Sequence, residues 1–198
     1  KVVGRGELMN SRVHGSEDAL AEETCARLVD GIAPELLIGG LGMGYTLRQA
    51  LDMLSPRAQV VVGELLGAVV DWNHAFFGDL NGRPLDDGRV DLQAGDIVEL
   101  ISRSRSRFDA ILLDIDHTPD FWLHSSHQDL YSEDGLRRVK SFLKPHGVFA
   151  LWSNDPPEDG FIKRLSTVFA SVAGHPVRFD NPLLQAVSTN GVYVARCG

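Results

Sequence analysis

Acidic side chains follow three short apolar runs, and they are the residues of this sequence best suited to chemistry. Glu64 ends the run 59–63, Asp96 follows the run 90–94, and Asp114 closes the run 108–113. Beside a substrate, a carboxylate such as that of Asp114 can position an amine or take its proton as a general base. A helix cap or a turn role is the alternative for Asp114. If the runs are neighbouring parallel strands, the three acids converge on one site.

A glycine-rich turn follows a fourth apolar run, 36–38. It contains Gly40, Gly42 and Gly44, and helical spacing begins directly after it at Tyr45. At such a turn the backbone N–H groups and the helix dipole face a ligand. The order G-x-G-x-G differs from the dinucleotide fingerprint G-x-G-x-x-G, which would need a glycine in place of Tyr45. The turn therefore favours an adenosine-type cofactor without a second nucleotide.

Two of the acids would complete an adenosine pocket around this turn. Glu64 lies about twenty residues beyond it, where an acid can accept hydrogen bonds from both ribose hydroxyls, and Leu65 follows it. Asp96 could accept from an adenine amino group, with Ile97 beside the ring. The alternatives are a surface glutamate that begins a helix and an aspartate that caps one. A cap at Asp96 is compatible with adenine binding.

Histidine and aspartate residues gather in the segment 115–132, which raises the question of a metal. Asp116, His117, His124, His127 and Asp129 could ligate a divalent ion. No H-E-x-x-H or equivalent pattern anchors them, and loops at active sites are often rich in histidine, so we predict no metal site. The alternating serines and arginines of 102–107 are expected to form a solvated helix end and loop rather than a nucleic-acid contact.

A sheet is needed to bring these residues together, and the pattern of the chain predicts one. Short apolar runs alternate with segments of helical spacing, which predicts an open α/β sheet that is parallel over its first five strands. Ligands of such sheets bind beyond the carboxyl ends of the strands, where the glycine turn and the three acids lie. The expected strands are 35–38, 59–63, 90–94, 108–113 and 148–152, with closing strands near 177–179 and 192–195 in an antiparallel hairpin around 181–190.

Helices are expected to connect these strands. Ser16 precedes two acids and is the expected N-cap of the first helix. Residues 78–88 and 144–147 are expected to form turns. The expected helices are 16–32, 45–54, 65–77, one from 97, 133–143 and 161–170.

Composition limits the classes of partner. The 198 residues suit a single domain, 1–198, with residues 1–15 as a loose lead-in. A formal net charge of −8 argues against a nucleic-acid partner and fits a cationic small-molecule substrate. No apolar run approaches the ~20 residues that span a bilayer, and no signal peptide is evident, so we expect a cytoplasmic protein without a membrane partner. Cys25 and Cys197 are expected to be reduced thiols.

Taken together, these motifs resemble those of the spermidine synthase (polyamine aminopropyltransferase) branch of the class I methyltransferase fold. The resemblance extends over about residues 16–197. The long turn before Arg89 favours this branch over methyltransferases at large. The matching parts are the segments 37–44, 79–80, 89–96, 108–114, 130–132 and 143–148, together with Glu64.

This resemblance implies a Rossmann-like class I methyltransferase fold, with a seven-stranded, mostly parallel sheet, an antiparallel last strand and helices on both faces. It also implies transfer of an aminopropyl group from decarboxylated S-adenosylmethionine to a diamine or polyamine, with methylthioadenosine as product. By position, Glu64 would hold the ribose, Asp96 the adenine and Asp114 the attacking amine. The implied substrate contacts are Asp116, His117 and Tyr131.

The sequence departs from that family at the glycine turn. Met43 stands where the family has an acid, and Tyr45 stands where it has a glycine. We also expect the family's N-terminal β-domain to be absent. Methyl transfer from S-adenosylmethionine to a small molecule is therefore the second hypothesis, and a catalytically silent, nucleoside-binding relative is the third. Because the family forms dimers, a homodimer is a further expectation.

Overall fold

One seven-stranded sheet organises the chain, in the order β3-β2-β1-β4-β5-β7-β6. The computed structural model describes residues 13–29, 32–103, 107–122, 127–181 and 185–198. Neighbours are parallel from β3 to β5, whereas β7 is antiparallel to both β5 and β6, which confirms the predicted α/β topology. The strands are β1 (Glu35–Gly39), β2 (Gln59–Glu64), β3 (Val90–Ala94), β4 (Phe108–Leu113), β5 (Leu143–Ser153), β6 (Ser171–Asn181) and β7 (Ala186–Arg196).

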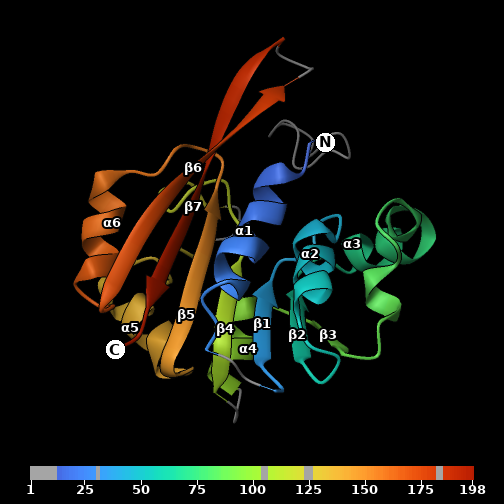
Figure 1. Ribbon diagram of the computed structural model, residues 1–198, viewed down its shortest axis with the longest axis horizontal. Coiled ribbons are helices and arrows are strands. Elements are labelled where there is room, and N and C mark those ends of the chain that lie inside the picture. The colour runs from blue at the N-terminus through green and yellow to red at the C-terminus, as the bar shows by residue number, and fades with distance from the viewer. Residues whose placement is uncertain (1–12, 30–31, 104–106, 123–126, 182–184) are drawn as a thin grey trace.

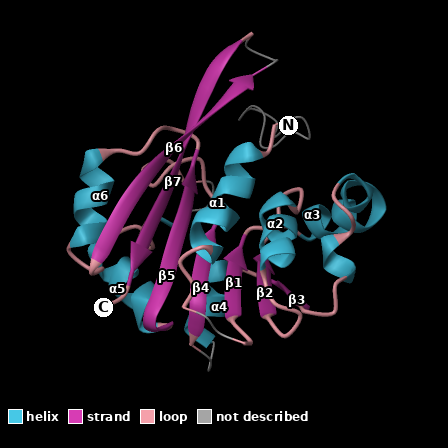
Figure 2. Cartoon of the chain, in the orientation of Figure 1, coloured by secondary structure: helices cyan, strands magenta, loops and turns pink. Residues whose placement is uncertain are grey.

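Helices cover both faces of the sheet (Figure 1, Figure 2). Residues of α1, α2 and α3 pack into the apolar core on one face, and residues of α4, α5 and α6 pack into the core on the other. The helices are α1 (Gly15–Cys25), α2 (Tyr45–Met53), α3 (Gly67–Trp72), α4 (Ile97–Arg103), α5 (Glu133–Ser141) and α6 (Asp159–Ser166). A π-helix (Asn73–Phe77) continues α3, and short 3₁₀ turns follow at Gly78–Leu80 and Pro84–Asp86.

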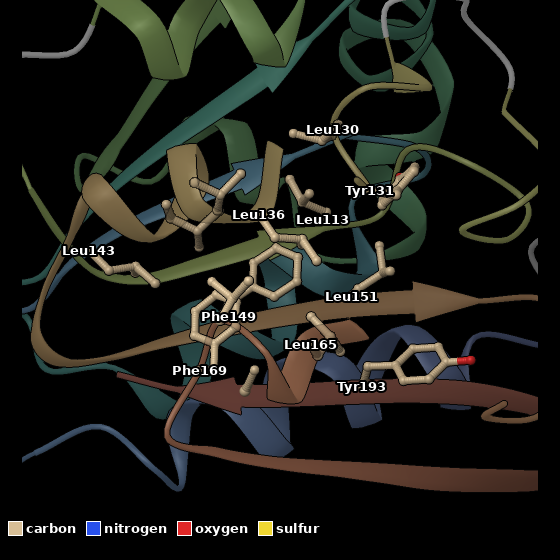
Figure 3. Packing of buried hydrophobic residues seen from close by; sticks show 14 of the residues in the cluster. Leu113, Leu130, Tyr131, Leu136, Leu143, Phe149, Leu151, Leu165, Phe169 and Tyr193 are labelled. Carbon is tan, nitrogen blue, oxygen red and sulfur yellow. The ribbon is translucent and has the colours of Figure 1, made fainter. Parts of the chain in front are cut away.

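Side chains that point alternately to the two faces of the strands contribute to both apolar cores. In β1, Leu36 and Ile38 face the core under α1 and α2, while Leu37 faces the opposite core. Because parallel strands are covered on both faces, they appear in the sequence as continuous apolar runs. In the second core, the rings of Phe149 and Phe169 stack with centroids 5.7 Å apart (Figure 3). The strands that carry the site residues are thus held rigidly from both sides.

The first helix is shorter than predicted, and its start differs. It ends at Cys25 rather than near Ile32; Val29 and Ile32 are 62% and 74% exposed, so these two side chains contribute little apolar burial to a longer helix. The prediction of Ser16 as the N-cap is wrong. His14 holds that position, and Ser16 lies in the first turn with its side chain buried.

The second half of the chain contains more strand than predicted. Residues 144–147, predicted as a turn, lie within β5, where the register with β4 is irregular and His146 adopts a φ of 61°. The closing hairpin is also longer, since β6 and β7 pair from Ser171–Arg196 to Asn181–Ala186. Many side chains of this ladder are exposed or half-buried, so it leaves little apolar pattern. The last helix is Asp159–Ser166 rather than 161–170.

Candidate functional site

A cavity of about 270 Å³ opens at the carboxyl-terminal edge of the sheet. It lies where strand order reverses between β1 and β4, as expected for a ligand site in an open parallel sheet. Among the residues predicted to bind a cofactor, those in its wall are Gly40, Gly42, Glu64, Leu65 and Ile97. Among the residues predicted to act on or contact a substrate, Asp114, Asp116 and His117 also line it. The wall does not include Gly44, Asp96 or Tyr131.

The glycine turn forms the floor of this cavity, and its glycines are required by the backbone. Gly40, Gly42 and Gly44 have φ values of 88°, 52° and 84°, which L side chains rarely adopt. At Gly40 the turn also presses against the end of β4, since a Cβ there would lie 2.1 Å from the carbonyl oxygen of Asp114. Gly44 supports the turn from outside the cavity as the residue before α2.

The carboxylate of Glu64 joins the floor to the end of β2. Its Oε2 accepts a hydrogen bond from the Leu41 N–H (2.9 Å) and its Oε1 from the Leu66 N–H (2.8 Å). These bonds fix a carboxylate that is 7% exposed within the cavity wall. Because each carboxylate oxygen accepts more than one hydrogen bond, Glu64 retains acceptor capacity for ribose hydroxyls.

Asp96 acts as a helix cap. Its Oδ1 accepts from the Val98 N–H (2.8 Å), and its carbonyl accepts from the Leu100 N–H in the first turn of α4. The side chain stands behind the cavity, 3.9 Å from His127 Nε2, while its neighbours Gly95 and Ile97 reach the wall. The apolar Ile97 side chain is therefore the contact from this strand end that is available to an adenine ring.

Asp114 carries the most perturbed carboxyl group of the cavity. Its Oδ2 accepts from the hydroxyl of Thr46 (3.1 Å), at the start of α2. Burial, and then the nearby charges of Glu17 and Glu64, raise the pKa of Asp114 to about 7, although the Thr46 hydrogen bond acts in the opposite direction. A carboxyl group with such a pKa can exchange a proton with a ligand near neutral pH.

Asp116, in the cavity wall, belongs to a buried polar network with Tyr131 and His127. Its Oδ2 accepts from the Tyr131 hydroxyl (2.7 Å) and lies 2.9 Å from His127 Nδ1. Burial and the adjacent carboxylate raise the pKa of Tyr131 well above its usual value, so this phenol remains a hydrogen-bond donor. The ring of Tyr131 is 1% exposed and packs edge-on against Phe161. Tyr131 therefore lies behind Asp116 and outside the cavity. Asp116 and His127 are both part of the cavity wall.

A comparison with models of protein families identifies the family of this chain. The family model described as the spermine/spermidine synthase domain matches residues 32–175. The chain belongs to the spermine/spermidine synthase family. That matched range includes the glycine turn, Glu64, Asp96 and Asp114, so these motifs lie within the part of the chain that matches the family.

The curated relatives that match are described as polyamine aminopropyltransferases. Polyamine aminopropyltransferase 2 of Pseudomonas aeruginosa is 30% identical over 143 residues, which are 69% of this chain and 40% of that protein. The polyamine aminopropyltransferase of Bacillus subtilis is 26% identical over 121 residues, which are 61% of this chain and 41% of that protein. The chain therefore spans less than half the length of these two relatives.

Solved structures of two spermidine synthases and of a methyltransferase-like protein share the fold. Spermidine synthase from Thermotoga maritima superposes with a TM-score of 0.72 at 22% identity, covering 92% of this chain and 59% of that one. A spermidine synthase in complex with the transition-state analogue AdoDATO gives a TM-score of 0.70 at 21% identity, covering 92% and 58%. Human methyltransferase-like protein 13 in complex with SAH gives 0.64 at 19%, covering 92% and 79%. The predicted class I methyltransferase fold is thereby confirmed.

Among the cavity residues that were not predicted as site residues, three lie beside its acids. Glu17 of α1 and Thr46 of α2 flank Asp114, and His127 was considered only as a metal ligand. Nothing in their local sequence marks Thr46 or Glu17, since each approaches Asp114 only through tertiary packing. For His127, the density of histidine and aspartate in 115–132 was a usable signal.

The structure also bears on metal, thiol and membrane predictions. Within the described ranges, no group of three or more His, Cys, Asp or Glu side chains is arranged to hold a metal ion, and His124 lies outside those ranges. Much of the serine–arginine tract, 104–106, is also outside them. Cys25 and Cys197 are free thiols, as predicted. None of the helices in the described part of the chain has the length and apolar character needed to cross a membrane.

Proposed function

We propose that this chain catalyses aminopropyl transfer from decarboxylated S-adenosylmethionine to a diamine or polyamine, with methylthioadenosine as by-product. Family membership supports this reaction. The main structural support is the position of Asp114 in the cavity together with its raised pKa. A carboxyl group with a pKa of about 7 stands in the cavity over a glycine turn suited to a nucleoside. The group can therefore be charged when an ammonium binds and can also accept a proton from it.

The residues around the cavity fit a nucleoside donor. Glu64 would accept from the ribose hydroxyls, Ile97 would contact the adenine ring, and the glycine turn would lie against the donor. Gly40 and Gly42 present only backbone to the cavity, because neither carries a side chain. Decarboxylated S-adenosylmethionine would supply an activated carbon next to a sulfonium ion.

The transfer step would be a nucleophilic displacement that Asp114 assists. The acceptor nitrogen forms a bond to the carbon next to sulfur, and the carbon–sulfur bond breaks with its electron pair going to sulfur. The sulfonium thereby becomes the neutral thioether of methylthioadenosine. Asp114 positions the amine and takes the proton that the nitrogen releases. Asp116 and His117 would line the acceptor side of the same cavity.

A thermal-shift comparison of three ligands tests this proposal. Because stabilisation grows with ligand concentration over the dissociation constant, even weak binding raises Tm. We expect larger shifts with decarboxylated S-adenosylmethionine and methylthioadenosine than with S-adenosylmethionine. A preference for intact S-adenosylmethionine would instead support methyl transfer, and no shift with any of the three would overturn the nucleoside site.

A substitution at Asp114 separates catalysis from binding. Asp114→Asn keeps an acceptor for the Thr46 hydroxyl but cannot take a proton, so it should abolish transfer while methylthioadenosine still binds. Turnover that persists in this variant would show that another group acts as the base. A wild-type chain that binds the nucleoside but never turns over would support a catalytically silent relative.

A further inference from the structure

We propose that Glu17 is a specificity-determining residue that, beside Asp114, binds a protonated primary amine of the ligand. The residue lies on α1, and neither the family match, which begins at residue 32, nor the glycine turn includes it. The inference rests on the proposed function and deepens it. It explains how this cavity would select decarboxylated S-adenosylmethionine or a diamine over S-adenosylmethionine, whose carboxylate would face the same acids.

Glu17 and Asp114 are joined through one side chain. Both line the cavity, and Thr46 Oγ1 lies 3.1 Å from Asp114 Oδ2 and 3.4 Å from the carbonyl oxygen of Glu17. Helix α1 reaches this position because it packs against α2 and across β5 and β7. The two acids thus approach the same part of the cavity from different elements.

A chain of buried polar groups fixes the Glu17 carboxylate. The Ser16 hydroxyl donates to Glu17 Oε2 (2.6 Å), and Asn190 Nδ2 of β7 donates to the Ser16 oxygen (3.3 Å). Ser16 is 2% exposed and Asn190 is 7% exposed, so both groups are out of bulk water. Burying such a chain requires that its members be hydrogen-bonded to one another, and here it ends on a carboxylate in the cavity wall.

The charge of the cavity has the sign that an ammonium requires. Its described wall contains the carboxyl groups of Glu17, Glu64, Asp114 and Asp116, and no lysine or arginine. Burial raises the pKa of Glu17, and burial followed by the charge of Glu17 raises the pKa of Asp114. A bound ammonium between the two would stabilise both in their charged forms, whereas a ligand carboxylate would be repelled.

Two amines could occupy this place, that of the donor's aminopropyl group and that of the acceptor. Isothermal titration calorimetry on the wild type and Glu17→Gln distinguishes them with four probes: methylthioadenosine, decarboxylated S-adenosylmethionine, S-adenosylmethionine, and 1,4-diaminobutane added to the methylthioadenosine complex. Glu22→Gln is the matched control. It lies on the same helix, outside the cavity, and its side chain accepts from Gln49.

We expect Glu17→Gln to weaken one amine-bearing probe by about ten-fold or more, as for the loss of a charged hydrogen bond. Methylthioadenosine has no amine on its side chain, so its affinity should stay within about two-fold. Loss confined to the decarboxylated donor places the donor amine at Glu17, and loss confined to the diamine places the acceptor there. The preference over S-adenosylmethionine should shrink if the donor amine binds there.

Two results would overturn the inference. Unchanged affinity for both decarboxylated S-adenosylmethionine and 1,4-diaminobutane would remove Glu17 from ligand recognition. An equal loss for methylthioadenosine would show that the substitution distorts the cavity rather than removing an amine contact. Both results leave the proposed function standing, because they require a wild type that binds the nucleoside. A wild type that binds none of the probes would overturn the proposed function and this inference together.

Discussion

The hydroxyl of Thr46 lies 3.1 Å from Oδ2 of Asp114 and links the start of α2 to the end of β4. This hydrogen bond lowers the pKa of a carboxyl group that burial, Glu17 and Glu64 raise to about 7. The other titratable groups in the described cavity wall are Tyr45, Asp116, His117 and His127. Thr46 therefore helps to set the pH at which Asp114 can act as a base.

Replacing that hydroxyl should move the pH dependence of transfer. In the wild type, the rate should rise with pH as Asp114 loses its proton near pH 7. Thr46→Val keeps the shape of the side chain but removes the donor, so the rise should move upward by roughly half a unit to one unit. The pH profile of kcat/KM checks this.

Thr24→Val provides the control for Thr46→Val. Thr24 is also a buried helical threonine, and its hydroxyl donates to the Leu20 carbonyl away from the cavity. Its substitution should leave the pH profile in place. An unshifted profile in Thr46→Val would show that the hydroxyl has no influence on the catalytic carboxyl group.

Asp114 should also make folding stability depend on pH. Its folded pKa of about 7 lies above its usual value near 4. Between these values the folded state holds a proton that the unfolded chain has released, so the free energy of unfolding falls as pH rises. Asp114→Asn removes this loss, which should be on the order of 2 kcal/mol in a cavity open to water.

Urea denaturation at pH 5 and pH 8 measures the effect of Asp114→Asn. The variant should gain stability relative to the wild type on going from pH 5 to pH 8. Asp91→Asn, at an exposed site on β3, is the control and should not change the difference between the two pH values. A variant that loses stability at pH 8 would contradict the raised pKa of Asp114.

Because Gly40 lies in close contact with Asp114, replacing Gly40 should strongly lower the free energy of unfolding. Gly40→Ala would place a Cβ 2.1 Å from the Asp114 carbonyl oxygen, at a residue whose φ is 88°. We expect a loss of about 3 kcal/mol or more in the free energy of unfolding, since both strain and a backbone clash are introduced. Gly88→Ala, where a Cβ would meet nothing within 4 Å, should change it by less than about 1 kcal/mol. Similar values for both variants would contradict the tight packing of the turn.

The sheet and the acids at its edge could be predicted because their signals are local. The central parallel strands are covered on both faces and therefore appear as apolar runs, and Glu64 and Asp114 directly end two of these runs. The contact of Glu17 with the cavity depends instead on how α1 packs over the sheet, which no local pattern shows. Ser16 looked like a helix cap because of its residue type, yet its hydroxyl serves the Glu17 carboxylate inside the protein.

Tyr131 tests how far a role can be carried over from a family. The resemblance implies a substrate contact, whereas in the structure the hydroxyl donates to Asp116 of the cavity wall and Tyr131 does not itself line the cavity. We expect Tyr131→Phe to lower the free energy of unfolding by about 1–2 kcal/mol, because a buried carboxylate loses a donor. The KM for the amine acceptor should stay unchanged.

Tyr193→Phe is the matched variant for Tyr131→Phe. Tyr193 is equally buried. Its phenol oxygen accepts a hydrogen bond from the backbone N–H of Glu158, whereas the Tyr131 hydroxyl donates to a carboxylate. Its substitution should cost less stability than Tyr131→Phe. A large rise in acceptor KM in Tyr131→Phe with little loss of stability would restore the direct substrate contact.

A substitution at Glu64 should show whether one carboxylate both holds the glycine turn in place and binds the nucleoside. Both of its oxygens accept backbone N–H groups, from Leu41 and from Leu66. Glu64→Gln replaces one acceptor by an NH₂ group that faces an N–H donor, so one of these bonds must be lost. We expect methylthioadenosine to bind about ten-fold more weakly, because the ribose acceptor is weakened and the turn is displaced. Calorimetric titration measures this affinity, and Glu99→Gln on the exposed side of α4 is the control. Unchanged affinity in Glu64→Gln would mean that the ribose is held elsewhere in the cavity.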